Sequence, residues 1–176
     1  MLFNQDAVSY GQAIQNGEMT SKQLVEWTLE NIERLNPVLN AVIYTYADYA
    51  LERADELDQH LASLSQTERQ MLSPFYGVPL LLKDIGQYWK GTVTSSASQL
   101  LLDQAAGHTD HSIQLAEDAG FVFIGRSNIP EFGLKTVSDS KYFGAVKNPM
   151  DLDYNPGGSS GGAAAAVKSG MVPLAT

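Results

Sequence analysis

Apolar residues recur at helical spacing through the first third of the chain. The pattern predicts a short helix that Asp6 caps and Gly17 ends, because a polar N-cap and a glycine after the last turn are common helix boundaries. A second helix is predicted to open at a capping box formed by Thr20 and Gln23. Pro37 is expected to stop it. Its apolar positions are Leu24, Val25, Leu29, Ile32 and Leu35.

The segment that follows changes its periodicity twice. Residues 41–46, AVIYTY, are rich in strand-forming residues. Residues 47–63 return to helical spacing, and residues 63–74 show no periodic pattern and are expected to be a connection. The predicted apolar stripe of the helix consists of Ala47, Ala50, Leu51, Ala54, Leu57 and Leu61.

From residue 75 onward the apolar residues form unbroken runs. The runs GVPLLLKD (77–84) and GFVFIGRS (120–127) are flanked by glycine and are typical of strands buried on both faces. Between them, a helix is expected to begin at an N-cap at Asp110 and to end at Gly120. The alternation of strand and helix indicates an α/β arrangement.

A final small-residue helix is predicted over AAAAVKSG (163–170). We therefore expect one domain over residues 1–176, with a helical region at 1–65 and an α/β part at 75–176.

The composition limits the binding partners and the cellular location that can be expected for this chain. The chain has 20 acidic and 11 basic residues and a net charge of −9, which disfavours binding to the phosphates of nucleic acid. It has no cysteine, which excludes disulfides, thiolate metal sites and cysteine nucleophiles. No apolar run has the length of a membrane span, and the N-terminal residues lack a signal-peptide pattern. The sequence predicts a cytoplasmic setting with no membrane or nucleic-acid partner.

The stretch NPGGSSGGAAAAVKSG (155–170) matches the G-x-S-x-G pattern of hydrolases and nearly matches a phosphate-binding loop. A hydrolase elbow with Ser160 as nucleophile needs an acid and a histidine later in the chain, and none follows Gly162. A phosphate-binding loop needs a glycine where the chain has Val167. The sequence therefore favours neither a hydrolase elbow nor a phosphate-binding loop.

The three histidines do not suggest a metal site. His108 and His111 lie beside Asp110, but no cysteine or third histidine is near them, so an exposed loop is expected. His60 falls in a charged helical stretch and is expected at the surface. No metal or organic cofactor is predicted.

Residue types alone leave two segments open to more than one interpretation. Lys83 follows the apolar run PLLL; such a lysine is usually solvated, and it acts as a base only where its surroundings disfavour the charged form. The glycine-serine stretch could be a flexible linker. It could equally bring hydroxyls to a helix N-terminus, where backbone N–H groups favour negative charge.

Four segments together resemble the amidase signature family in order and spacing. Neither the lysine strand nor the PGGSSGG loop is specific alone, but the pair at this separation is. The resemblance covers about residues 75–176 and implies helices packed on a mixed sheet. The matching segments are GVPLLLKDIG (77–86), HSIQLAEDAGFVFIGRSNIPEFG (111–133), FGAVKNPMDLDYNPGGSSGGAAAAV (143–167) and SGMVPLAT (169–176).

What the resemblance implies is hydrolysis of a carboxamide, a small-molecule amide, by a Ser–cisSer–Lys triad. Lys83 corresponds to the general base, and Ser159 to the middle serine, after a cis peptide bond from Gly158. Lys83 Nζ is then expected within hydrogen-bond reach of Ser159. The supporting loop implied by the resemblance consists of Gly157, Gly158, Ser160, Gly161 and Gly162, with Ser160 acting by hydrogen bonding and not by proton transfer.

One part of the family pattern is missing. The nucleophilic serine and the oxyanion hole of the family lie farther along the chain, beyond MVPLAT (171–176). The resemblance therefore implies the N-terminal part of a longer amidase, incomplete at the C-terminus and inactive by itself. Such a chain is expected to pair with the missing part or to self-associate.

Two alternatives remain beside the stand-alone amidase. The glutaminase (A) subunit of a tRNA-dependent amidotransferase shares the triad, but its usual segment after the lysine reads KDNI, whereas this chain has KDIGQYWKG (83–91). A non-enzymatic folding or interaction unit would expose apolar sheet edges to a partner. The sequence does not indicate the amide substrate.

Overall fold

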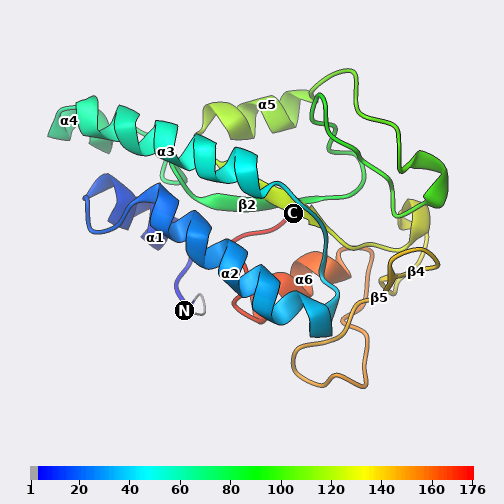
Figure 1. Ribbon diagram of the computed structural model, residues 1–176. Helices are drawn as coiled ribbons and strands as arrows, with labels where there is room; N and C mark the ends of the chain where they lie inside the picture. Colours follow the sequence, from blue (N-terminus) through cyan, green and yellow to red (C-terminus); the bar gives the residue numbers. More distant parts are fainter. Residues whose placement is uncertain (1–3) are drawn as a thin grey trace.

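The computed structural model describes residues 4–176 (Figure 1), and Met1–Phe3, part of the predicted helical region, lie outside the described residues. A helical N-terminal region leads into a mixed sheet with further helices. The longer elements in chain order are α1 (Ala7–Gln15), α2 (Ser21–Leu39), β1 (Val42–Thr45), α3 (Ala47–Ser63), α4 (Gln66–Gln70), β2 (Pro79–Lys83), α5 (His111–Asp118), β3 (Val122–Ser127), β4 (Asp139–Ser140), β5 (Gly144–Ala145) and α6 (Gly161–Lys168). Two short 3₁₀ turns lie at Gln99–Leu101 and Glu131–Gly133.

The caps predicted for the first two helices are confirmed. The Asp6 carboxylate accepts the Ser9 N–H at 2.8 Å at the start of α1. At the start of α2, Thr20 and Gln23 each accept the other's backbone N–H at 3.0 Å. Two donors that the first helical turn leaves without partners are satisfied by this reciprocal pair.

The expectation that Pro37 stops α2 is wrong, because the helix continues to Leu39. Pro37 lies in the last turn, where its missing N–H removes one bond without breaking the turns before it. The helix ends at Asn40, which adopts a left-handed conformation (φ 51°) and donates its N–H to Asn36 O at 2.8 Å.

The second half of the helical region follows the predicted stripe. In Figure 1, α2 and α3 run side by side across the sheet, and α3 buries Ala50, Ala54, Leu57 and Leu61. The expected connection at 63–74 contains the short helix α4, which opens with a Ser65–Glu68 capping box. This helix has no buried residue, so no apolar periodicity marked it in the sequence.

The central sheet has the order β1-β3-β2 and is mixed, as the fold prediction requires. β2 and β3 pair in parallel, β1 pairs antiparallel to β3, and all six residues of β3 are buried. After α6 the chain returns to β2: Leu81 forms a parallel bridge with Ala175, and the chain end lies beside β2 in Figure 1. β3 is therefore the covered centre of the sheet.

α5 begins and ends where the sequence predicts, but its cap differs. Asp110 is the N-cap residue, yet its side chain does not cap the helix. The carboxylate instead accepts the backbone N–H of Tyr88 at 2.8 Å. Gly120 closes the helix with a positive φ of 87°. Within residues 4–176, none of the helices is long and apolar enough to cross a membrane.

Candidate active site

Lys83 and Ser159 meet, although 76 positions separate them in the sequence. Lys83 is the last residue of β2 and Ser159 lies just before α6; both are half-buried. Lys83 Nζ lies 2.8 Å from Ser159 Oγ and donates to it, and the Gly158–Ser159 peptide bond is cis. The predicted distance and the predicted cis bond are both present, and the alternative of a freely solvated strand-end lysine is wrong.

The hydrogen-bond partner of Lys83 Nζ is an uncharged group. No carboxylate forms an ion pair with Lys83 among residues 4–176. The partner found for the amine is the Ser159 hydroxyl. The arrangement can therefore pass a proton between an amine and a hydroxyl.

Glycines let the start of α6 approach the strand ends. A Cβ on Gly162 would lie 2.4 Å from Asn128 O and 2.6 Å from Ala41 O, and the Gly162 N–H donates to Asn128 O at 3.0 Å. A Cβ on Gly161 would lie 2.4 Å from Ser138 Oγ. The first turn of α6 thus packs against backbone at Gly162 and against the Ser138 side chain at Gly161, and a glycine fits best at both positions.

The two glycines before Ser159 are also required by local geometry. Gly157 has a φ of 93°, a conformation that side chains disfavour. A Cβ on Gly158 would lie 3.0 Å from the backbone of Val137. The glycine-serine stretch is therefore a packed loop, and the interpretation of it as a flexible linker is wrong.

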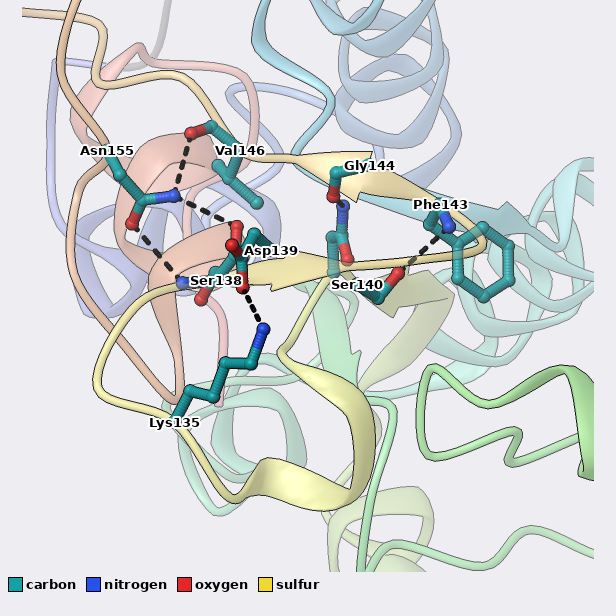
Figure 2. Close-up of polar contacts among 9 residues, drawn as sticks. Lys135, Ser138, Asp139, Ser140, Phe143, Gly144, Val146 and Asn155 are labelled. Carbon is teal, nitrogen blue, oxygen red and sulfur yellow. Dashed lines mark hydrogen bonds and ion pairs between the residues drawn. The ribbon is translucent and has the colours of Figure 1, made fainter.

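Ser138 and Asn155 hold this loop in place. Ser138 Oγ accepts the Gly161 N–H at 2.9 Å and donates to Ser159 O at 3.4 Å. Figure 2 shows the Asn155 side chain beside the start of β4 and the end of β5. Its amide group donates to Ser138 O at 2.9 Å and to Val146 O at 3.1 Å. Its Oδ1 accepts the N–H groups of Ser138 and Gly157, at 3.2 and 2.9 Å.

These two residues take the supporting role that the family resemblance implies for Ser160. Ser160 is the N-cap residue of α6, but its side chain makes no capping bond, and no hydrogen bond of its Oγ is found among residues 4–176. Sequence reasoning missed Ser138 because it lies 21 positions before Ser159. An Asn just before Pro-Gly-Gly is a turn signal that could have indicated Asn155.

The residue after Lys83 is a buried acid. Asp84 has no exposed surface, and its carboxylate accepts the N–H groups of Ser95 and Ala97, both at 2.9 Å, as well as the Ser95 hydroxyl. Burial raises the pKa of Asp84 above its usual value, and these hydrogen bonds act against that rise. Sequence reasoning did not single out this residue.

The histidines lie apart from this site, as expected. His108 and His111 are exposed, and His108 Nε2 contacts Asp110 at 3.2 Å. His60 is exposed and contacts the Tyr76 hydroxyl at 2.8 Å. In the part of the chain that the structure describes, no group of three potential metal ligands comes together.

Comparison with known proteins shows the family of this chain. Residues 23–176 match the model of the Amidase family, and the chain belongs to that family. It is 39% identical over 170 residues to the lipoamidase of Enterococcus faecalis, covering 97% of this chain and 22% of the relative. It is 41% identical over 164 residues to the A subunit of the glutamyl-tRNA(Gln) amidotransferase of Alkalilimnicola ehrlichii, covering 93% of this chain and 32% of that protein.

The fold of this chain is also similar to that of a solved amidase. The solved structure of a bacterial aryl acylamidase of the amidase signature enzymes superposes with a TM-score of 0.85 at 32% identity, covering 97% of this chain and 34% of that one. The chain thus spans about a fifth to a third of the length of the relatives that it matches.

Proposed function

We propose that this chain supplies the base and the proton-relaying serine of an amidase that hydrolyses a small-molecule carboxamide. The observation that carries the proposal is the 2.8 Å contact between Lys83 Nζ and Ser159 Oγ. That separation lies within the range in which a positioned base takes a proton. Family membership supports the reaction class.

In the proposed mechanism, neutral Lys83 takes the proton of Ser159, and Ser159 takes the proton of an attacking serine hydroxyl. The attacking oxygen forms a bond to the amide carbon and produces a tetrahedral intermediate. The proton then passes back through Ser159 to the leaving nitrogen, and the C–N bond breaks. Water releases the acyl group by the same relay run again.

The attacking serine is proposed to come from a segment beyond Thr176. Without it the relay has no hydroxyl to activate, so the 176-residue chain by itself is expected not to hydrolyse amides. We also keep as predictions the absence of an organic cofactor, of a nucleic-acid partner and of a membrane partner, and the cytoplasmic setting. Self-association, or pairing with a complementary segment, likewise stays a prediction.

A chimera tests the proposal. This chain replaces the 170 residues that it matches in the E. faecalis lipoamidase, so that the remainder of that enzyme supplies the missing segment. Amide hydrolysis is followed by product release. Lys83→Met and Ser159→Ala are each expected to lower kcat by about a thousandfold or more, the usual loss when a member of such a triad is removed.

Matched controls separate catalysis from folding. Lys168→Met and Ser112→Ala change the same residue types at exposed positions and are expected to keep activity within about twofold. Retention of activity by Ser159→Ala in a folded chimera would refute the relay. Turnover by the 176-residue chain alone, lost on Ser159→Ala, would show that it has its own nucleophile.

The glutaminase component of a tRNA-dependent amidotransferase is the second candidate. The observation that favours it is the 41% identity to a protein named as the A subunit of such an enzyme. The segment KDIGQYWKG after Lys83 favours the stand-alone amidase. Co-purification of a larger tRNA-binding protein with this chain would reverse the preference.

A further inference from the structure

Arg126 is an arginine with no access to water. It lies on β3, its exposed fraction is 0%, and it is the largest side chain buried in the described residues. An arginine in the interior is costly unless its donors and its charge are compensated. The hydrogen-bond partners of Arg126 therefore indicate its structural role.

Each of three nitrogens of the guanidinium has a different partner. Nε donates to the Tyr46 hydroxyl at 2.9 Å, and Nη2 donates to Thr92 Oγ1 at 3.2 Å. Nη1 donates to the carbonyl oxygen of Lys83 at 3.0 Å. The planar fork thus connects two structural hydroxyls to the main chain of the proposed base.

A buried carboxylate next to Lys83 in the chain has the charge opposite to that of Arg126. Asp84, the next residue in the chain, is also fully buried, and the charge of Arg126 acts to lower its pKa against the larger effect of burial. The two groups form no ion pair within 4 Å among residues 4–176. The guanidinium is therefore left free to bond the Lys83 carbonyl rather than the carboxylate.

The backbone N–H of Lys83 is held as well. The Lys83 N–H donates to Gln87 Oε1 at 2.6 Å and to Thr176 Oγ1 at 3.1 Å. With N–H and C=O both bonded, the last residue of β2 cannot fray as strand ends commonly do. The direction of the Lys83 side chain then follows from a fixed main chain.

We propose that Arg126 is a positioning residue that fixes the carbonyl of Lys83 and so directs Lys83 Nζ toward Ser159 Oγ. This inference rests on the proposed function, in which that contact is the proton relay. A lysine at this position would keep the charge but not the fork, because its single nitrogen cannot reach three separate acceptors in one plane.

Competitive acetylation of the purified 176-residue chain tests the proposal without any activity assay. Acetic anhydride modifies lysine amines, and mass spectrometry gives the modification rate of Lys83 relative to exposed Lys168. Arg126→Met and Arg126→Lys are both expected to raise this ratio about five- to tenfold, the factor that corresponds to one lost hydrogen bond. Ser159→Ala, which removes the acceptor, is expected to raise it similarly.

Two matched variants separate positioning from general stability. Thr92→Val and Tyr46→Phe each remove one partner of the same guanidinium but leave its bond to Lys83. They are expected to lower stability while changing the Lys83 ratio by less than about twofold. If Arg126 had only a structural role, the Lys83 acetylation ratio would rise in proportion to the loss of stability in the two Arg126 variants and in these two variants alike. That outcome would overturn the proposal.

The remaining outcomes are also decisive. If Ser159→Ala raises the Lys83 ratio and Arg126→Lys does not, the relay contact stands and the role of Arg126 is refuted. If Ser159→Ala leaves the ratio unchanged, the relay contact itself is absent and the proposed function fails with it. Should the Arg126 variants not fold, NMR on the unmodified chain decides: a scalar coupling across the bond from Arg126 Nη1 to the Lys83 carbonyl is expected, and its absence refutes the proposal.

Discussion

Gly162→Ala most directly tests how closely the start of α6 packs on the ends of the strands. The new Cβ would lie 2.4 Å from Asn128 O, 2.5 Å from Asn128 N and 2.6 Å from Ala41 O. All three are backbone atoms, which cannot rotate away. Because an ordinary contact begins at about 3.4 Å, the start of α6 has to move outward by about 1 Å.

The magnitude follows from overpacking. Forcing extra volume into a packed site costs about 1–3 kcal/mol, and the better helix propensity of alanine offsets at most about 1 kcal/mol of that. We expect a net loss of about 1–2 kcal/mol, or a fall in Tm of about 2–8 °C for a chain of this size. A shift of about 1 Å also takes Ser159 Oγ beyond hydrogen-bond distance of Lys83 Nζ, now 2.8 Å away.

The assay is urea unfolding followed by circular dichroism, together with the acetylation ratio of Lys83. Gly107→Ala is the matched control, because no atom lies within 4 Å of a Cβ there and its φ is not positive. The control is expected to change stability by less than about 0.5 kcal/mol. Equal unfolding midpoints for Gly162→Ala and the unmodified chain would show that α6 does not pack on the strand ends.

Three further substitutions probe the loop before α6, the start of α2 and the buried Asp84. Ser138→Ala leaves the Gly161 N–H without its acceptor and is expected to cost about 1–2 kcal/mol in urea unfolding; a loss no larger than that of exposed Ser112→Ala would contradict the loop network. Thr20→Ala removes half of the α2 capping box and is expected to cost about 1 kcal/mol in the same assay, with no change in the Lys83 ratio. Asp84 has a raised pKa in the folded state, so its contribution to stability is full below its ordinary value of 3.8 and is lost as pH rises through the folded pKa. Asp84→Asn should therefore gain in stability relative to the unmodified chain as pH rises through that window, and a difference independent of pH would refute the cause assigned to the shift.

Several features of the fold could be predicted because they depend on neighbours in the sequence. The Thr20–Gln23 capping box and the closure of α5 at Gly120 involve residues within one or two turns. The strands β2 and β3 could be predicted because strands buried on both faces have no polar side to interrupt the apolar run.

Two of the three errors have equally local causes, and the third comes from a contact between distant residues. Pro37 was expected to stop α2, but a proline in a last turn breaks only its own hydrogen bond. The short helix α4 buries nothing and so has no periodicity to reveal it. Asp110 caps no N–H of α5, because the Tyr88 N–H, 22 positions away, takes its carboxylate.

The sequence by itself determined the apolar pattern, the glycines of the loop and the pair of motifs that carry Lys83 and Ser159. Only the tertiary structure decided that these two side chains meet, that Ser138 rather than Ser160 supports the loop, and that Arg126 bonds the main chain of Lys83. Local patterns report bonds between residues a few positions apart. These three contacts join residues 76, 23 and 43 positions apart, and their partners are set by strand register and by how closely α6 packs on the sheet.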